Sequence, residues 1–346
     1  MAESHTNHPP ILTVTLNTAI DRVLEVEGFA VGAHLPAREL SRFPAGKGVN
    51  LSRALARIGR DNIATGFVGS EDADSFEQLL KAASPGRANC QLLSVRGRTR
   101  ENITILDRIN HTDTHIRTAG YELSRNDVQR IISKIGLLTR EGSIIVISGS
   151  LPSGMTVANL DTLIYMAIGG RAKVVLDLEG KLLAQCSSVE LAVAGEEDEP
   201  PPSVEGERSR MVWMVKPNRQ ELADALGLEK LEGERQLLEA GRRLTRRVSW
   251  VVLTLGAQGA ILFGREGTWR GWCEVDPDQV VSTVGCGDCL LAGVLDAQAA
   301  GAEPEEVLRN GIAVATANAL RPGVAEFDAD LVHRTYAVTR IEAVTE

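Results

Sequence analysis

The chain has 346 residues, of which 43% are hydrophobic, and its 37 Lys and Arg against 46 Asp and Glu give a net charge of −9. This length and apolar fraction suit one large α/β domain or two smaller ones. The negative charge disfavours nucleic acid and anionic membranes as partners. No apolar run reaches the roughly 18 residues of a membrane-spanning helix, so no span is expected.

The N-terminal segment and the cysteines both favour a cytoplasmic protein. Residues 1–10 are polar, lack the apolar core of a secretory signal and are expected to form a disordered tail. The five cysteines are scattered and too few for a disulfide framework, which indicates a reducing compartment.

Short apolar runs alternate with helix-like segments along most of the chain. Strands are expected at 11–16, 62–68, 143–148, 172–178, 211–215 and 250–255, and helices at 51–58, 72–83, 124–139, 156–168, 304–320 and 327–338. Such alternation is typical of βαβ units and a parallel sheet.

Two regions depart from this pattern. Residues 23–42 alternate irregularly, and short strands are expected at 90–95, 101–107 and 114–118; together these pieces are predicted to form a small separate sheet. Residues 194–210 are acidic, rich in proline and almost free of hydrophobic residues, so we expect a disordered surface insertion without a catalytic role.

The stretch 282–294 has the strongest chemical signature. Gly285, Cys286 and Gly287 precede Asp288, and an apolar helix-like run begins at once. Glycine lets a backbone approach a ligand closely, and a helix start presents unpaired N–H groups and a positive dipole end. This combination makes an anion site suited to phosphate. Asp288 is either a helix cap or a base placed beside that phosphate.

A second glycine-containing helix start lies near the N-terminus. Gly46, Lys47 and Gly48 precede a helix that also carries Asn50, although the spacing is not that of a P-loop. Asp21 lies just past the first strand, where ligands of open α/β sheets collect. An Asx turn explains Asp21 equally well.

Further polar residues have two readings each. His34, Arg38 and Arg42 are all at even-numbered positions, so on one strand their side chains would face the same side. There they either meet an anionic ligand or form a solvated edge strand. Asn218 and Glu221 share a face at a helix start, where simple N-capping accounts for them.

Gly256 and Gly259 follow the strand at 250–255. They either let a nucleotide lie against the backbone or form a plain hairpin turn.

Taken together, five short motifs in order make the chain similar to the PfkB, or ribokinase-like, carbohydrate kinases over nearly its whole length. They are residues 45–52, 148–152, 216–221, 254–259 and 282–294. Each motif is weak alone, but the ordered set is specific. The resemblance implies an α/β fold of three α/β/α layers with a mostly parallel central sheet, in one kinase domain over 11–340. It also implies a small β-sheet lid built from about 22–43 and 94–119.

Within the family, residues 15–21, 46–48 and 98–102 resemble the hexose-phosphate branch. That branch includes 1-phosphofructokinase, tagatose-6-phosphate kinase and the minor 6-phosphofructokinase. The resemblance implies ATP-dependent phosphorylation of a ketohexose phosphate. Fructose 1-phosphate is the first choice of substrate, with tagatose 6-phosphate and fructose 6-phosphate as alternatives.

Two rival classes are weaker. A catalytically silent sugar-phosphate-binding regulator would not need Asp288, and a dinucleotide-binding oxidoreductase would need a GxGxxG motif after the first strand, which is absent.

The family resemblance also implies residue roles. Asp288 would take the sugar hydroxyl proton, while the N–H groups of Gly285, Cys286 and Gly287 form an anion hole. The substrate would contact Asp21, Gly46, Lys47, Asn50, Arg100, Ser150, Arg38 and Arg117, with Lys47 and Arg100 on its phosphate. ATP would lie along Lys216, Asn218, Glu221, Thr254, Gly256 and Gly259. Mg²⁺ would lie near Asn218 and Glu221, held through water. Lid closure would exclude water, and by analogy the lid forms a homodimer contact.

The chain departs from the family pattern at Cys286 and Cys289, which replace a small residue and a serine. A Cys-x-x-Cys pair at a helix N-terminus lowers thiol pKa and favours a disulfide. This raises the hypothesis of a redox brake on the anion hole. The alternative is that the cysteine is simply a small residue that the family tolerates at this position.

Overall fold

The computed structural model describes residues 11–84, 86–186 and 212–345. The expected tail at 1–10 and the expected insertion at 194–210 lie outside the described residues. Within the part described, no helix is both long and apolar enough to cross a membrane.

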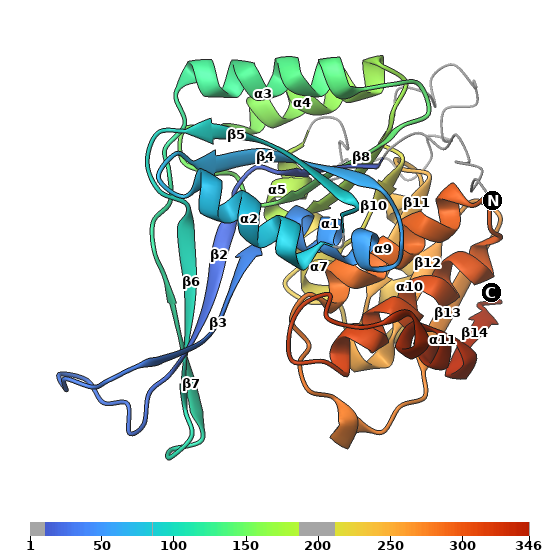
Figure 1. Ribbon diagram of the computed structural model, residues 1–346. Coiled ribbons are helices and arrows are strands. Elements are labelled where there is room, and N and C mark those ends of the chain that lie inside the picture. Colours follow the sequence, from blue (N-terminus) through green and yellow to red (C-terminus); the bar gives the residue numbers. More distant parts are fainter. Residues whose placement is uncertain (1–10, 85, 187–211, 346) are drawn as a thin grey trace, which may run out of the picture.

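A ten-stranded sheet forms the middle layer of the molecule, in the order β14-β13-β12-β11-β10-β9-β8-β1-β4-β5 (Figure 1). Its parallel strands are β1 (Ile11–Thr15), β4 (Asn62–Gly69), β5 (Ala88–Val95), β8 (Ile144–Gly149), β9 (Lys173–Leu178), β10 (Met214–Val215) and β11 (Trp250–Thr254). Three antiparallel strands complete one edge: β12 (Ala260–Phe263), β13 (Thr268–Cys273) and β14 (Thr339–Ala343).

Helices cover both faces of this sheet, because successive strand residues are apolar on both sides. Val174 packs with one core cluster and its neighbour Val175 with the other. The first cluster includes α3 (Arg125–Leu138), α4 (Val157–Gly169), α5 (Gly180–Gln185), α7 (Arg219–Ala225) and α8 (Gly233–Leu244). The second includes α1 (Lys47–Arg57), α9 (Cys286–Ala299), α10 (Pro304–Ala319) and α11 (Ala329–Val338). The predicted three-layer α/β/α fold is therefore confirmed.

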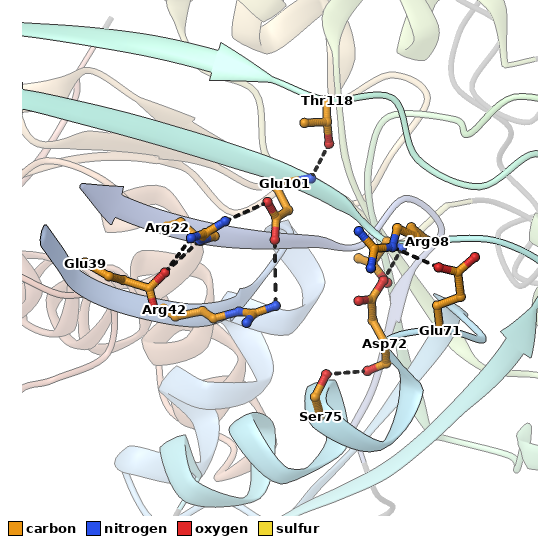
Figure 2. Close-up of polar contacts among 10 residues, drawn as sticks. Arg22, Glu39, Arg42, Glu71, Asp72, Ser75, Arg98, Glu101 and Thr118 are labelled. Carbon is orange, nitrogen blue, oxygen red and sulfur yellow. Dashed lines mark hydrogen bonds and ion pairs between the residues drawn. The ribbon is translucent and has the colours of Figure 1, made fainter. Parts of the chain in front are cut away.

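A separate four-stranded sheet, in the order β3-β2-β6-β7, projects from this body (Figure 1). Its strands are β2 (Ala19–Glu25), β3 (Arg38–Ala45), β6 (Arg100–Asp107) and β7 (Thr112–Arg117). One face carries ion pairs among Arg22, Glu39, Arg42 and Glu101 (Figure 2). We call this four-stranded unit the small sheet.

One strand assignment to the small sheet was wrong. Residues 90–95 belong to β5, which pairs in parallel with β4 at the edge of the large sheet. β5 follows α2 (Ala73–Ala83) and so completes a βαβ unit. Its short alternating pattern has the same period of two residues in either sheet, so the pattern could not assign it.

Other elements were placed imperfectly or missed. The helix expected from Leu51 begins at Lys47, directly after Gly46. The helix α8 and the strands β12 to β14 were not predicted. The α8 helix does carry a regular apolar face, formed by Leu237, Ala240, Gly241 and Leu244.

Candidate active site

The polar residues of the site gather at the carboxyl edge of the parallel strands. Thr15, Ser148 and Asp177 are register partners at the ends of β1, β8 and β9. The helices α1 and α9 both pack on the same face of the sheet. Open α/β sheets bind ligands at this edge.

The start of α9 has the backbone geometry of an anion site. Gly285 precedes the helix with a φ of 74°, and a Cβ there would lie 2.6 Å from Val324 Cγ1, so only glycine fits. No side chain caps this helix start. Among the predicted donors, the Cys286 N–H makes a 3.3 Å bond to the Thr283 carbonyl, which a phosphate oxygen can replace.

Asp288 lies in the first turn of α9 and is only 7% exposed. Its Oδ2 accepts a 2.9 Å hydrogen bond from Asn50 Nδ2 of α1. Burial, followed by the negative charge of Asp177, raises the pKa of Asp288 to about 7. A carboxylate with this pKa suits a general base near neutral pH. Among the described residues, its side-chain hydrogen-bond partner comes from another helix.

Asp177 is a central residue that the sequence did not single out. It is 1% exposed and lies between Lys47 Nζ at 3.1 Å and Lys216 Nζ at 3.2 Å. Although burial opposes the shift, these two ammonium groups lower the pKa of Asp177. Its position at the end of a buried strand was the sequence feature that could have identified Asp177 as a site residue. Lys216 also approaches α9, since a Cβ on Gly287 would lie 3.3 Å from its Nζ.

A second group of side chains lies at the base of the small sheet, near the starts of β2 and β6. Asp21 Oδ1 accepts a 2.7 Å hydrogen bond from Asn102 Nδ2. Burial raises the pKa of Asp21, against the effect of Asn102 and of the Arg100 charge. Arg100 also donates to the Asn17 carbonyl at 3.3 Å, and Asn17 Nδ2 donates to Ser150 Oγ at 3.1 Å.

Arg117 joins this group from β7. It is the register partner of Asn102, and its charge also acts on the Asp21 carboxylate. The two predicted arginines Arg100 and Arg117 are therefore brought to one place, together with Asp21.

Several buried polar atoms near this edge have no hydrogen-bond partner among the described residues. They are Thr15 Oγ1, Asn50 Oδ1, Arg100 Nε, Asn102 Oδ1 and Ser148 Oγ. Buried polar groups are almost always paired, so such atoms indicate that a polar ligand completes the site. Both donors and acceptors are represented, as a ligand with hydroxyl groups requires.

Arg38 is not brought to the site. It pairs with Glu25 at the far end of the small sheet, seven residues along β3 from Ala45, or about 23 Å at the usual rise per residue. The expectation that His34, Arg38 and Arg42 share one face was wrong. His34 precedes β3, and a register shift in the β2–β3 pairing places Arg38 and Arg42 on different faces.

The residues expected around the nucleotide form well-defined turns. Asn218 and Glu221 make a reciprocal capping box at the start of α7, as the capping alternative anticipated. Asn218 also bridges to Thr254, and Gly256 and Gly259 turn the chain between the antiparallel strands β11 and β12. Both glycines have positive φ, and a Cβ on Gly259 would overlap the Gly271 carbonyl. These two glycines therefore form a tight hairpin turn, and their contact with a nucleotide stays a prediction.

The fit of a divalent cation is mixed. In the described part of the chain, no group of three or more His, Cys, Asp or Glu side chains has the geometry of a metal site. However, Asp177 Oδ1 and Glu221 Oε1 both lie 3.1 Å from Lys47 Nζ, so two carboxylates converge there. Carboxylate oxygens suit Mg²⁺, which retains several waters and needs few protein ligands.

The premise of the redox hypothesis was wrong. Burial raises the pKa of Cys286 and raises that of Cys289 well above its usual value. Both are free thiols, and Cys289 is fully buried. Desolvation disfavours the thiolate, and the neighbouring Asp288 charge acts in the same direction on both thiols.

Comparisons with known proteins agree with this geometry. The model of the pfkB family of carbohydrate kinases matches residues 12–198 and 203–330. The chain is 27% identical to the 1-phosphofructokinase of Bacillus subtilis (strain 168), covering 96% of this chain and 100% of that protein. It is 30% identical to the 1-phosphofructokinase of Escherichia coli (strain K12), covering 88% and 89%.

Solved structures show the same fold. Phosphofructokinase-2 from Escherichia coli in complex with potassium superimposes with a TM-score of 0.81 at 24% identity, covering 95% of this chain and 98% of that chain. The same protein in complex with fructose-6-phosphate gives a TM-score of 0.79 at 24% identity, with the same coverage. The chain therefore belongs to the pfkB family of carbohydrate kinases, enzymes that transfer a phosphoryl group to a sugar hydroxyl.

Proposed function

We propose that this kinase uses ATP to phosphorylate a ketohexose phosphate, with fructose 1-phosphate as the preferred substrate and fructose 1,6-bisphosphate as the product. The observation that carries the proposal is Asp288, a buried carboxyl with a pKa of about 7 beside the uncapped start of α9. Similarity to two 1-phosphofructokinases supports the choice of substrate. Tagatose 6-phosphate and fructose 6-phosphate are the alternatives.

In the proposed reaction, the acceptor hydroxyl of the sugar gives its proton to an Asp288 oxygen as the hydroxyl oxygen attacks the γ-phosphorus of ATP. The bond from that phosphorus to the bridging oxygen breaks, and ADP leaves. The N–H groups of Gly285, Cys286 and Gly287 bind the charge that develops on the phosphoryl oxygens. Lys216, whose Nζ lies close to Gly287, and Lys47, which shares Asp177 with it, supply two further positive charges.

The sugar phosphate is assigned to the group of side chains at the base of the small sheet. Asp21 and Asn50 would bind sugar hydroxyls, with Gly46 and Ser150 lining the same space. Arg100 and Arg117 supply guanidinium groups for the phosphate already present, since arginine binds phosphate through two parallel hydrogen bonds. Arg38 is left out of this proposal because it lies at the far end of β3.

The nucleotide is assigned to the opposite side of Asp288. It would lie along Lys216, Asn218, Thr254, Gly256 and Gly259, where the tight turns expose the backbone. Asp177 and Glu221 are the carboxylates that would hold Mg²⁺, directly or through water, while Asn218 holds Glu221 in place through the capping box. The cation would neutralise charge on the β- and γ-phosphate oxygens.

The small sheet is proposed to act as a lid over the sugar and as a contact between two copies of the chain. A lid would exclude water and so limit the loss of ATP to hydrolysis. The site residues Asp21, Asn102, Arg100 and Arg117 all lie on its strands, so closure would bring them to the substrate. A cytoplasmic location belongs to the same proposal, because both substrates are charged metabolites.

The test is an ADP-release assay with purified enzyme, Mg²⁺ and ATP across fructose 1-phosphate, fructose 6-phosphate, tagatose 6-phosphate and free sugars. We expect the highest kcat/KM with fructose 1-phosphate. A highest value with another ketohexose phosphate would replace the substrate, and turnover of free sugars alone would refute the branch assignment. Binding of a sugar phosphate without any turnover would favour the rival regulator.

A further inference from the structure

Arg53 is a buried cation that the proposed reaction does not use. It lies on α1 one turn after Asn50, is 3% exposed and forms no ion pair with a carboxylate among the described residues. Burying an arginine is costly unless its donors are paired. Its hydrogen bonds therefore show what the fold gains from it.

The guanidinium of Arg53 bridges two segments that are far apart in the sequence. Nη1 donates to the Pro44 carbonyl at 3.4 Å, and Nη2 donates to the Val324 carbonyl at 2.8 Å. The guanidinium also lies 5.3 Å from the centre of the Phe43 ring. Its Nε is buried without a partner among the described residues. Arg53 is thus held by the end of β3 on one side and by the loop before α11 on the other.

Each of these two segments leads to one half of the proposed site. Phe43 is the register partner of Asp21, which we assign to the sugar. Val324 packs against Gly285, whose N–H belongs to the proposed anion hole. The loop at Val324 is also tied to Asn318, which accepts from the Ala325 N–H and donates to the Val284 carbonyl. Because these two bonds tie the loop to the segment before α9, a displacement of Val324 is expected to reach Gly285.

We infer that Arg53 is a positioning residue that makes the anion hole depend on the placement of the small sheet. The inference rests on the proposed kinase function. A sugar phosphate that holds the small sheet fixes Phe43 and Pro44, and through Arg53 it fixes Val324 against Gly285. The anion hole is then complete only when the acceptor is bound, which favours transfer over hydrolysis of ATP.

The chain provides a matched control, Arg57, one turn further along α1. Its Nε donates to the Ala325 carbonyl at 3.1 Å, so it holds the same loop, yet within the described chain it makes no hydrogen bond or ion pair to the small sheet. If Arg53 only stabilised the loop, loss of Arg57 would have a similar effect. If Arg53 couples the loop to the small sheet, only loss of Arg53 changes the dependence on the sugar.

The experiment compares Arg53→Met, Arg53→Lys and Arg57→Met with the wild type. For each enzyme, kcat for transfer is measured with saturating sugar phosphate, and ATP hydrolysis is measured without sugar. We expect Arg53→Met to lower kcat for transfer by roughly 10- to 100-fold, as for loss of support to an oxyanion site, with hydrolysis unchanged. The ratio of the two rates falls by the same factor. A lysine reaches only one of the two carbonyls, so Arg53→Lys is expected to restore stability without restoring the ratio.

A structural role alone would reduce the active fraction and scale both rates equally. An unchanged ratio in both Arg53 variants, or an equal fall in Arg57→Met, would overturn the inference. Should Arg53→Met fail to fold, Val324→Ala tests the same link, because it removes the contact with Gly285 without leaving an unpaired charge. This variant is also expected to lower the ratio of transfer to hydrolysis. Failure of the proposed function is separate, because it would appear as absent transfer in the wild type.

Discussion

The carboxyl edge of the large sheet and the outer face of the small sheet are both rich in charged side chains, but their charges are arranged differently. On the small sheet, Arg22 binds Glu39 and Glu101, and each member of these pairs is 24% to 41% exposed (Figure 2). At the large sheet, Asp177 and Lys216 are 1% and 5% exposed.

The difference separates structural from functional charge. Exposed ion pairs satisfy each other and contribute about 0–1 kcal/mol each. The buried cluster instead shifts the pKa of Asp288 and lies beside polar atoms that have no partner in the described chain. Perturbed titration together with unmet hydrogen-bonding capacity indicates a ligand site. Four changes test this contrast, in order of decreasing expected effect.

Asp288→Asn should have the largest effect. The amide cannot take the hydroxyl proton, so we expect kcat to fall roughly 10³- to 10⁴-fold, with a modest change in sugar phosphate binding. The wild-type carboxyl has a raised pKa because ionisation costs it solvation and brings a negative charge close to Asp177. The folded state therefore loses stability as pH rises through about 7. The variant should therefore have a higher Tm than the wild type at pH 8. Turnover near the wild-type rate would refute the base assignment.

Gly285→Ala should come second. Its Cβ would overlap Val324 and its φ is unfavourable for alanine, so we expect the anion hole to be displaced and kcat to fall about 10- to 100-fold. Gly301→Ala is the matched control, because Gly301 has the same φ of 74° at the far end of α9 but its Cβ would meet no atom within 4 Å. Equal effects of the two substitutions on kcat would contradict the role of the Gly285 backbone.

The pH profile should show an intermediate effect. A base with a pKa of about 7 must lose its proton to act, so kcat/KM should fall as pH drops below about 7. Asp177 raises that pKa, so Asp177→Asn should move the acidic limb to lower pH by about one unit. A limb that stays in place in this variant would mean that another group controls it. Rates across pH 5.5 to 8.5 provide the measurement.

Glu39→Gln should have the smallest effect. It removes an exposed partner of Arg22, which retains Glu101. We expect the free energy of unfolding to change by less than about 1 kcal/mol and kcat/KM to stay within a factor of two. A large loss of activity would show that the outer face of the small sheet contributes to the reaction.

The sequence predicted the parts of the molecule whose cause is local. Alternating apolar runs indicated the parallel sheet, and the glycines around the starts of α1 and α9 indicated the two helices whose first turns meet at the site. Asp177 escaped notice because its importance comes from Lys47 and Lys216, each about 40 residues or more away and joined to it only by the fold. The face of Arg38 was predicted wrongly because a register shift in the β2–β3 pairing cannot be read from whether residue numbers are odd or even.

The pairing of β2 with β6 has a consequence for how this enzyme is built. The two strands align in parallel from Ala19 with Arg100, although about 80 residues separate them. Each of the two chain segments that form the small sheet begins and ends at neighbouring positions. In the first segment Ala19 pairs with Ala45, and in the second the Thr118 N–H donates to the Glu101 carbonyl. The small sheet is therefore two insertions that become one unit only after the body has brought them together. Such long-range pairing carries a high loop-closure cost, so we expect the small sheet to assemble after the body. Both insertions would have to be shortened together to leave a stable three-layer scaffold.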